Sequence, residues 1–473
     1  MTSGIDSGAD LPAVGTAIGI RTATVAARLD GEIWAMAWPA ILSFAVVNVV
    51  DIIDVALVGR LGRVTVAAWG YASLCVNLVE TLLVAVGIGG VAIMARAIGA
   101  RDPDRARRAL AASMLIAVVV AGVGFGLAMT VPRVLLGWLN ASPDIVAIAV
   151  PYLRLTSGSM ILYAVAFMFE CGLRACKNTR APLAVGIVVM FVKTALSVLL
   201  VFGLLGLPRL GLVGAGIATV GAYGAGFVLF AIASRIAARS GAGVAFGPRD
   251  VLAMWGIVPE VLYVSLPAMG ERLVMNIALL TYFTILATFG TAAIAAYSIG
   301  VRLLAISWVP GLGFAAAAST LVGQALGAGD AARARRIGLR SVLQALGLMS
   351  VLSVLFLFLR GPLARQFTDD VQVERDLVPF MVMLAFAQPF IGVHFTLGGV
   401  LRGAGDTVTP LIGAAIGNWV FRVPLAWLFS HAFGAHLVLV WAAVVVDHCS
   451  RLVINGAAFV RGRWARRLGE AVR

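Results

Sequence analysis

Charge is scarce in this chain of 473 residues: charged side chains make up 12% of it, and the lysines are Lys177 and Lys193 alone. Soluble domains carry about 25% charged residues, so this composition excludes an ordinary soluble fold. Cysteine is also rare, with four residues that lack paired metal-ligand spacing, so neither a disulfide framework nor a zinc site is expected. The stretch 1–33 has no apolar core, so we interpret it as a cytoplasmic tail without regular structure and not as a cleaved signal.

Hydrophobic residues are abundant instead, at 61% of the chain, and they are grouped into long runs. A run of about 20 apolar residues is long enough to cross a bilayer as a helix. The sequence therefore predicts an all-α polytopic membrane protein with about twelve transmembrane helices. The expected spans are 34–59, 64–98, 106–131, 145–174, 182–207, 212–236, 251–289, 292–326, 337–359, 377–401, 409–433 and 437–460.

The net charge of +14 follows a membrane-topology pattern and not the pattern of a nucleic-acid-binding surface. Arginine and lysine gather in alternate loops, whereas the intervening loops carry few basic residues or balance them with acids. Because cytoplasmic loops are enriched in Lys and Arg, this alternation predicts that both termini are cytoplasmic and argues against nucleic acid as a partner. The basic segments are 96–108, 174–180, 235–249, 333–340 and 461–473.

The chain is a repeat with a constant offset of 228 positions, because residues 97–108 match residues 325–336. The same offset pairs Pro39 with Pro267. One shift across separate motifs predicts two homologous halves of about six helices each. An even number of helices makes the two repeats parallel, related by an axis along the membrane normal. The predicted regions are the tail 1–33, an N-lobe 34–236, a cytoplasmic linker 237–250, a C-lobe 251–462 and a cytoplasmic tail 463–473.

Two carboxylates interrupt the first apolar run. Asp51 and Asp54 stand at i and i+3, so their side chains share one helix face. Acids at that depth are costly and mark candidate functional sites. Two neighbouring carboxylates in a low-dielectric wall cannot both ionise cheaply, so we expect one proton to be held near neutral pH. Deprotonated, the pair would attract an organic cation that competes with the proton, and this competition would couple the two fluxes.

Four stretches carry a resemblance to a known family: VDIIDVALVG at 50–59, LVGQALGAGD at 321–330, LRGAGDT at 401–407 and RVPLA at 422–426. With these motifs the chain resembles the multidrug and toxic compound extrusion (MATE) transporters over nearly its whole length after the tail. The overall pattern is closer to the DinF-like branch of that family. The resemblance implies two six-helix lobes in a V shape, which export organic, often cationic, compounds against an inward proton or sodium flux.

The resemblance also assigns candidate ion-coupling residues. Carried over by position, Asp54 matches the acid of the family's first helix. One branch of the family places acids in the seventh and tenth helices, where this chain has Met275 and Ile391. The DinF-like branch often has Asn-x-x-x-Asp in the fifth helix, where this chain has Lys193 and Ser197. The second acid of either branch is thus missing, which leaves the coupling ion open.

Further residues are candidates for contacts to the substrate or to the two acids. Lys193 lies mid-helix, and a buried ammonium needs a partner, so we expect it either to pair with an acid of the first helix or to snorkel to an interface. Asn48, one turn before Asp51, is a hydrogen-bond candidate. Glu271, beside Arg272, is expected to form either a local ion pair or a substrate contact in the second lobe. The candidate set is completed by Pro39 and Ser197.

We therefore predict an antiporter that exports drug-like, often cationic, organic compounds by alternating access between its two lobes. Proton coupling is preferred to sodium coupling, because an acid pair that holds a proton near neutral pH suits proton exchange. The transporter is expected to act as a monomer in a bacterial inner membrane. It is expected to have no enzymatic activity and no cofactor or bound metal apart from the coupling ion, H⁺ or Na⁺.

Two alternatives stay open and one is disfavoured. The first is sodium coupling, and the second is a flippase for a lipid-linked precursor. A magnesium-dependent membrane prenyltransferase is disfavoured because it needs two acidic clusters, and the repeat counterparts of Asp51 and Asp54 are Leu279 and Tyr282. The arginines available to a flippase cavity are Arg154, Arg302 and Arg451.

Overall fold

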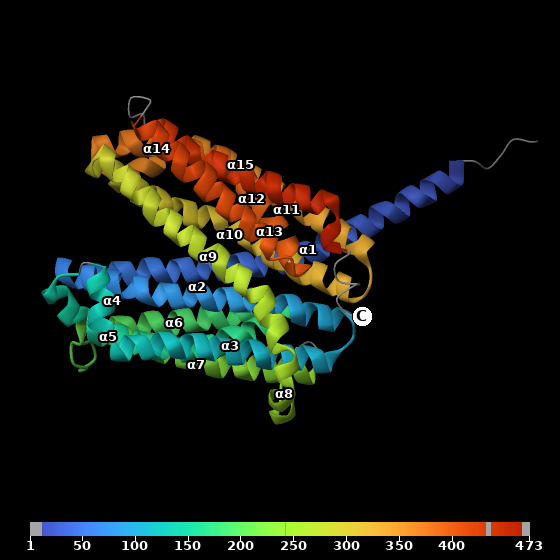
Figure 1. Cartoon of the computed structure of the whole chain (residues 1–473), viewed down its shortest axis with the longest axis horizontal. Coiled ribbons are helices and arrows are strands. Elements are labelled where there is room, and N and C mark those ends of the chain that lie inside the picture. The colour runs from blue at the N-terminus through green and yellow to red at the C-terminus, as the bar shows by residue number, and fades with distance from the viewer. Residues whose placement is uncertain (1–11, 140, 242, 432–436, 466–473) are drawn as a thin grey trace, which may run out of the picture.

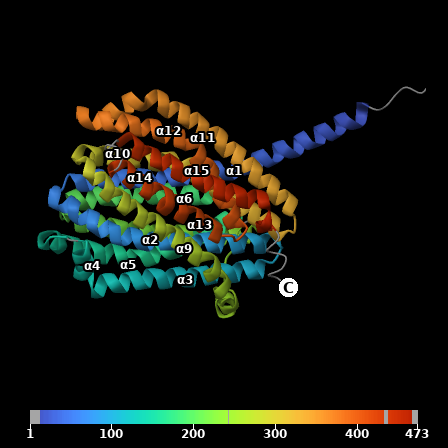
Figure 2. The same cartoon turned by 45° about the horizontal axis from the view of Figure 1, so that its top comes forward.

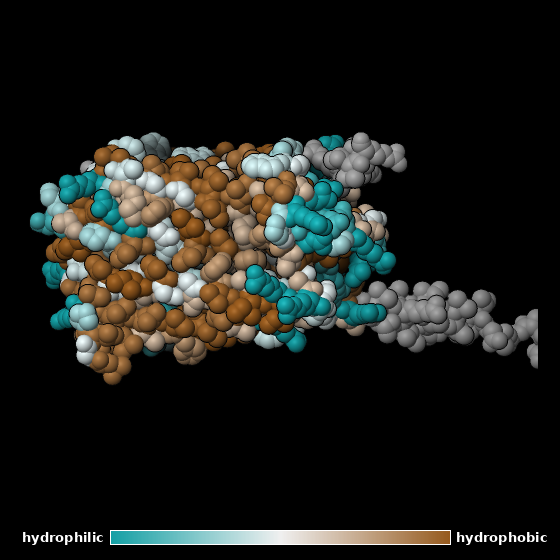
Figure 3. Space-filling model, turned by 90° about the horizontal axis from the view of Figure 1, so that it is seen from below, coloured by the Kyte–Doolittle hydropathy of each residue, from teal (hydrophilic) through white to brown (hydrophobic). Residues whose placement is uncertain are grey.

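The structure of the protein is a computed structural model that describes residues 12–139, 141–241, 243–431 and 437–465. Most of these residues are in helices (Figure 1). These ranges contain no β-strand. Twelve helices within them are long and apolar enough to cross a membrane, which confirms the predicted fold class. Figure 3 shows hydrophobic residues covering the middle of one face, with hydrophilic residues gathered toward both ends. Such a belt suits a protein that spans a bilayer.

The helices of the first half are separated by short loops whose residues cap them. Asp102, for example, accepts a hydrogen bond from the Arg105 backbone N–H at 2.8 Å and is followed by Pro103 at the first helical position. The helices are α1 (Pro12–Gly59), α2 (Arg63–Gly99), α3 (Pro103–Thr130), α4 (Pro132–Trp138), α5 (Pro143–Ala175), α6 (Arg180–Phe202) and α7 (Gly211–Arg239).

The second half repeats this arrangement. Asp330, the counterpart of Asp102 at the offset of 228, caps its helix through the Arg333 backbone N–H at 2.7 Å. The elements are α8 (Pro248–Ala253), η1 (Met254–Gly256), α9 (Val258–Leu286), η2 (Ala287–Phe289), α10 (Thr291–Gly327), α11 (Ala331–Phe367), α12 (Val371–Gly403), α13 (Val408–Ile416), η3 (Gly417–Arg422), α14 (Val423–His431) and α15 (Leu437–Arg461).

The first helix is longer than the sequence predicts. We expected residues 1–33 to lack regular structure, but α1 begins at Pro12, so the expectation is wrong from that residue onward. Proline suits the first turn of a helix, and no other proline follows it before Pro39. The alanine-rich stretch between the two prolines therefore continues as helix. Figure 1 shows this part of α1 projecting from the body of the molecule.

The two halves form two lobes that meet at one end and diverge toward the other (Figure 1). The lobes meet where the loops that follow α2, α5, α7, α10 and α12 lie, which we call the basic end. They diverge toward the end that carries α4 and α14, which we call the far end. Figures 1 and 2 place the start of α1 and the end of α15 at the basic end, as an even number of spans requires.

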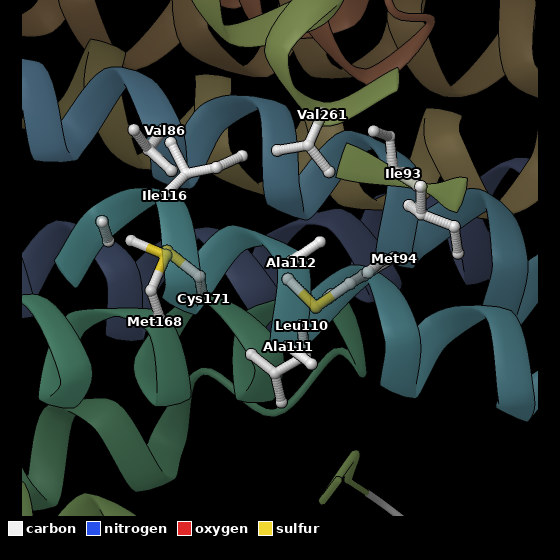
Figure 4. Close-up of a cluster of buried hydrophobic side chains, with 14 of the residues drawn as sticks. Val86, Ile93, Met94, Leu110, Ala111, Ala112, Ile116, Met168, Cys171 and Val261 are labelled. Atoms are coloured by element: carbon white, nitrogen blue, oxygen red, sulfur yellow. The ribbon is translucent and has the colours of Figure 1, made fainter. Parts of the chain in front are cut away.

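The first helix of each half packs against the other lobe at the basic end. Ile33 and Met36 of α1 are buried in one cluster with Phe314 of α10. Reciprocally, Val261 of α9 is buried with Ile93 of α2 and the residues of α3 around it (Figure 4). The lobes therefore share their cores at this end, and each first helix returns to its own lobe beyond an internal proline. These prolines are the repeat counterparts Pro39 and Pro267.

Two glycines let the lobes approach at the basic end. A Cβ atom on Gly99 of α2 would lie 2.0 Å from the Gln324 carbonyl oxygen of α10. A Cβ atom on Gly327 would lie 2.1 Å from the Arg96 carbonyl oxygen. Gly327 and Gln324 are the counterparts of Gly99 and Arg96 at the offset of 228, so the contact is symmetric. Only glycine permits backbones to cross this closely.

Candidate functional site

The first predicted acid is paired with the mid-helix lysine. Lys193 of α6 places its Nζ atom 2.5 Å from Oδ2 of Asp54 on α1. The two side chains are only 11% and 19% exposed, respectively. Each charge therefore compensates the other for the hydration that it loses on burial. The alternative that Lys193 snorkels to an interface is therefore wrong. The pair joins α1 and α6 of the N-lobe about midway along α6. A lysine in the middle of a membrane-spanning helix is far from water, so its ammonium needs such a partner.

The second acid lies in a different environment. Asp51 is exposed, and it makes no hydrogen bond with any described residue. Its electrostatic neighbours are Lys193 of α6, Asp54 of its own helix and Glu80 of α2. Charges from three helices of the N-lobe thus act on Asp51. One acid of the predicted pair is thus neutralised, and the other is accessible.

Glu80 also belongs to this site, although no motif or spacing connects it with the first helix. It interacts electrostatically with Asp51 and Lys193, and it also interacts with the hydroxyl of Tyr163 on α5. The Tyr163 ring packs against Tyr223 of α7, with ring centroids 5.0 Å apart. We call Asp51, Asp54, Glu80 and Lys193 the N-lobe charge cluster. A Tyr or Glu on a distant helix leaves no spacing signal in the sequence, so only the fold shows its membership.

The other predicted residues of the N-lobe lie nearby but make local contacts. Asn48 donates from Nδ2 to the Phe44 carbonyl oxygen at 2.9 Å and so does not bond to Asp51. Ser197, one turn after Lys193, is buried, and its hydroxyl has no partner among the residues described. Pro39 is buried inside α1, where its carbonyl oxygen accepts from the Ser43 hydroxyl at 2.8 Å.

The structure corrects the expected local pairing of Glu271 with Arg272. Glu271 instead forms an ion pair with Arg402 of α12, with Nη2 and Oε1 2.5 Å apart and both side chains about nine-tenths buried. Adjacent residues on a helix point in different directions, so neighbours in sequence rarely face each other. A residue of the last turn of another helix provides the partner instead.

The C-lobe holds a buried polar network that the sequence did not predict. Asp447 of α15 accepts hydrogen bonds from Arg451 at 2.6 and 3.0 Å, and Arg422 lies 3.8 Å from the same carboxylate. Arg422 also donates to the Tyr297 hydroxyl at 2.9 Å and lies 4.4 Å from the centroid of the Tyr282 ring. All five side chains are buried. Arg451 is therefore engaged by an acid and not available to a cavity.

The described residues of the two lobes show no metal centre. Within the described ranges, His, Cys, Asp and Glu nowhere gather in a group of three that could hold a metal ion. The four cysteines, all in these ranges, are free thiols.

A two-lobed bundle of membrane-spanning helices, with a carboxylate–ammonium pair inside one lobe, defines a class of protein, the helical membrane transporters. The MatE family model matches residues 39–199 and 267–428. The chain belongs to this family, which confirms the predicted MATE resemblance. It is accordingly a multi-pass membrane transporter and not an enzyme.

Individual relatives match along most of their length. The chain is 31% identical to a probable multidrug resistance protein NorM of Bradyrhizobium diazoefficiens, over 88% of this chain and 89% of that protein. It is 27% identical to a probable multidrug resistance protein NorM of Thermotoga maritima, over 92% and 93% of the two chains. The solved structure of the Vibrio cholerae MATE transporter VcmN in the bent form has a TM-score of 0.82 at 24% identity, covering 94% of this chain and 98% of that one. This last likeness supports the fold.

The two matched segments also measure the internal repeat. Their first residues, 39 and 267, differ by 228 positions, whereas their last residues, 199 and 428, differ by 229. We infer that the second half has one extra residue before position 428. A π-helix absorbs one extra residue within a helix, and η3 (Gly417–Arg422) is a π-helix in the span concerned. We infer that the counterpart of Lys193 is Arg422, one position beyond the offset that holds earlier in the chain.

Proposed function

We propose that this chain exports organic, often cationic, compounds in exchange for protons, and that Asp51 is the carboxylate at which the two exchange. The observation that carries the proposal is the unequal environment of the two neighbouring acids. Asp54 is held by Lys193 at 2.5 Å, whereas Asp51 is exposed and lacks a hydrogen-bond partner in the described chain. The names of the relatives, probable multidrug resistance proteins, support a drug-like cargo.

Competition at one carboxylate is sufficient to couple the two fluxes. A proton and an organic cation each neutralise Asp51, so binding of one weakens binding of the other. When the lobes part at the far end, a proton from outside displaces the cargo. When they part at the basic end, cargo from inside displaces the proton. Lys193 meanwhile pairs with Asp54, which leaves Asp51 as the carboxylate of the two at which proton and cargo compete.

The other predicted residues receive supporting roles in this proposal. Ser197 and Asn48 line the helix faces next to the acids, and Pro39 bends α1 so that its two halves serve different lobes. Glu271 is held by Arg402 and supports the C-lobe instead of contacting the cargo. These assignments follow from the contacts of each side chain, and each can be tested by substitution.

The orientation in the membrane follows from the loops. Because the loops of the basic end carry most of the arginines, we propose that this end and both termini lie in the cytoplasm. The regions 34–236 and 251–462 would then be the two lobes, joined by the cytoplasmic linker 237–250. We further propose that the protein acts as a monomer in the bacterial inner membrane, needs no cofactor, and is closer to the DinF-like branch.

Transport by purified protein in liposomes tests the proposal. Ethidium movement is measured under an imposed proton gradient, and separately under a sodium gradient at fixed pH. The variants are Asp51→Asn and, as a matched control, Asp369→Asn, which changes an exposed acid outside the membrane-spanning helices. We expect the proton gradient to drive ethidium export by the control at the wild-type rate, and Asp51→Asn to lose at least nine-tenths of the gradient-driven rate.

Each other outcome excludes a part of the proposal. Full coupling by Asp51→Asn removes this residue from the exchange. Transport driven only by sodium at fixed pH replaces the proton as coupling ion. If neither gradient moves ethidium but the protein moves a fluorescent lipid across the bilayer, the chain is a flippase and not a drug exporter.

A further inference from the structure

Lys193 is a cation that the chain itself places inside a site for cations. It lies in the middle of α6, its side chain is 11% exposed, and its ammonium contacts Asp54 at 2.5 Å. A bound organic cation must share the N-lobe charge cluster with this ammonium. The lysine cannot leave the site as a transported ion does, so its charge is a permanent part of the environment that the cargo meets.

The charges of the cluster can be counted. Asp51, Asp54 and Glu80 supply three carboxyl groups, and among the residues that the structure describes Lys193 supplies the cation that interacts with them. The tyrosine hydroxyls that interact with these acids, those of Tyr152, Tyr163 and Tyr223, are neutral near neutral pH. With the protonation of the acids unchanged, removing the lysine makes the site more negative by one charge.

The two halves differ in the group that faces the cation at the position of Lys193. Its counterpart Arg422 faces the Tyr282 ring, and Tyr282 is the counterpart of Asp54. The arginine is engaged by Asp447 and Tyr297 within the same lobe. At this position the C-lobe thus has a tyrosine where the N-lobe has a carboxylate, so we assign the charge that a bound cation meets to the N-lobe.

We propose that Lys193 determines the charge of the cargo: by neutralising Asp54 it tunes the N-lobe site for monovalent organic cations and against divalent ones. This inference rests on the proposed function, since it concerns the same site. A dication gains more than a monocation from each added negative charge, so loss of the ammonium favours dications. Loss of the Asp54 carboxylate, which leaves the ammonium uncompensated, disfavours them.

The test compares two dyes that share one ring system, ethidium with one positive charge and propidium with two. Their dissociation constants are measured on purified full-length protein at low salt, and the ratio of the two constants is the readout. The variants are Lys193→Met, Asp54→Asn, the double variant that carries both changes, and Lys193→Arg. The double variant has the same net charge in the site as the unchanged protein, so it separates charge from packing.

We expect Lys193→Met to change the ratio of the two dissociation constants by about tenfold in favour of propidium binding. This is the change in affinity that one unit charge produces roughly 10 Å away in a protein environment. Asp54→Asn should shift it in the opposite direction. The double variant and Lys193→Arg should return to the wild-type ratio. A merely structural role for Lys193 would weaken both dyes alike and would not be rescued in the double variant.

The inference fails if the ratio is the same in all variants, or if the double variant stays shifted. If Lys193→Met does not fold, the opposite shift in Asp54→Asn and its reversal in the double variant still decide the question. Failure of the proposed function is recognised separately, because the unchanged protein would then not move ethidium under a proton gradient. In that case the charge ratio could still follow the predicted order.

Discussion

Arg422 lies 4.4 Å from the centroid of the Tyr282 ring and so forms, in the C-lobe, the contact that corresponds to Lys193 and Asp54 in the N-lobe. Both lobes bring a cation from the fifth span of the half against the first span. The N-lobe meets that cation with a carboxylate and the C-lobe meets it with an aromatic face. A cation over a ring is stabilised by the ring quadrupole without a second charge. The two halves thus share a geometry and differ in chemistry.

We predict that the ring of Tyr282, and not its hydroxyl, carries most of this contact. Tyr282→Phe removes one hydrogen bond, which the hydroxyl donates to the Val440 carbonyl oxygen at 2.8 Å, and should cost about 1 kcal/mol of stability. Tyr282→Leu also removes the cation–π contact and leaves a cavity, and should cost about 3 kcal/mol or more. Thermal unfolding of the purified variants in one detergent measures both values.

The control is a double-mutant cycle in which the Tyr282 variants are combined with Arg422→Met. If Arg422 and the ring interact, the double variant with Tyr282→Leu and Arg422→Met loses less unfolding free energy than the two single variants together. Additive costs, or equal costs for the phenylalanine and leucine variants, would show that the contact contributes nothing.

The sequence predicted the number and position of the spans because each depends on a local property, the length of an apolar run. It also predicted the repeat, because one offset joins several motifs. It did not predict that the first helix of each half packs on the opposite lobe, since Ile33 and Val261 lie in ordinary apolar runs. Nor did it find the extra residue before Arg422, because a π-helix changes hydrogen bonding without changing the hydrophobic pattern.

We predict that the paired glycines at the basic end control how closely the lobes meet. Gly99→Ala and Gly327→Ala would place a methyl group about 2 Å from an opposing carbonyl oxygen, so the two backbones must separate. Overpacking of this kind costs about 1–3 kcal/mol, and the cost falls only on the closed arrangement. Electron–electron distances between spin labels at the exposed positions Asp104 and Ala332 should therefore lengthen in both variants.

Gly126→Ala provides the matched control for the glycine variants. A Cβ atom on Gly126, inside α3, would meet no heavy atom within 4 Å, so the label distances should stay unchanged. An unchanged distance in Gly99→Ala and Gly327→Ala as well would show that the lobes tolerate a methyl group at the crossing.

The candidate site was only partly predictable. Asp51 and Asp54 were identified because acids are conspicuous in an apolar run, and Lys193 for the same reason. Their separation into a paired and an accessible acid depends on which face of α1 meets α6, which spacing alone does not give. Glu80 was not connected with the site because its neighbours come from other helices.

We predict that Glu32 links the lobes at the basic end by bridging two cations. Its carboxylate lies 2.6 Å from Lys177 in the loop after α5 and 3.1 Å from Arg333 of α11. All three side chains are partly exposed, so each pair is worth about 1 kcal/mol or less and is weakened by salt. Glu32→Gln should therefore slightly lengthen the distance between spin labels at positions 104 and 332 at low salt, and it should have no effect on this distance at high salt. Asp369→Asn, an acid without such partners, is the control, and an effect of Glu32→Gln that persists at high salt would contradict the bridge.

Cys176 should report the opening of the basic end through its ionisation. It lies between Ala175, whose carbonyl oxygen accepts from Gln324 of α10 at 2.7 Å, and Lys177, which pairs with Glu32. Burial raises the pKa of the Cys176 thiol from its ordinary value of 9.0 to about 12. Because the pKa is raised in the closed form, this form holds the proton more tightly. The closed form is therefore favoured fully below pH 9, and this contribution is lost as the pH rises toward 12.

The thiolate is the form that reacts with maleimides, so the reaction rate measures how often the thiol is released. In a chain whose other three cysteines are alanine, Cys176 should react slowly at pH 8, and its rate should continue to rise well above pH 9. Gly99→Ala and Glu32→Gln, which open the basic end, should raise the rate at pH 8 and move the midpoint of the pH profile down toward 9. A wild-type midpoint already near 9, or variants that leave the profile unchanged, would show that Cys176 is not shielded by the meeting of the lobes.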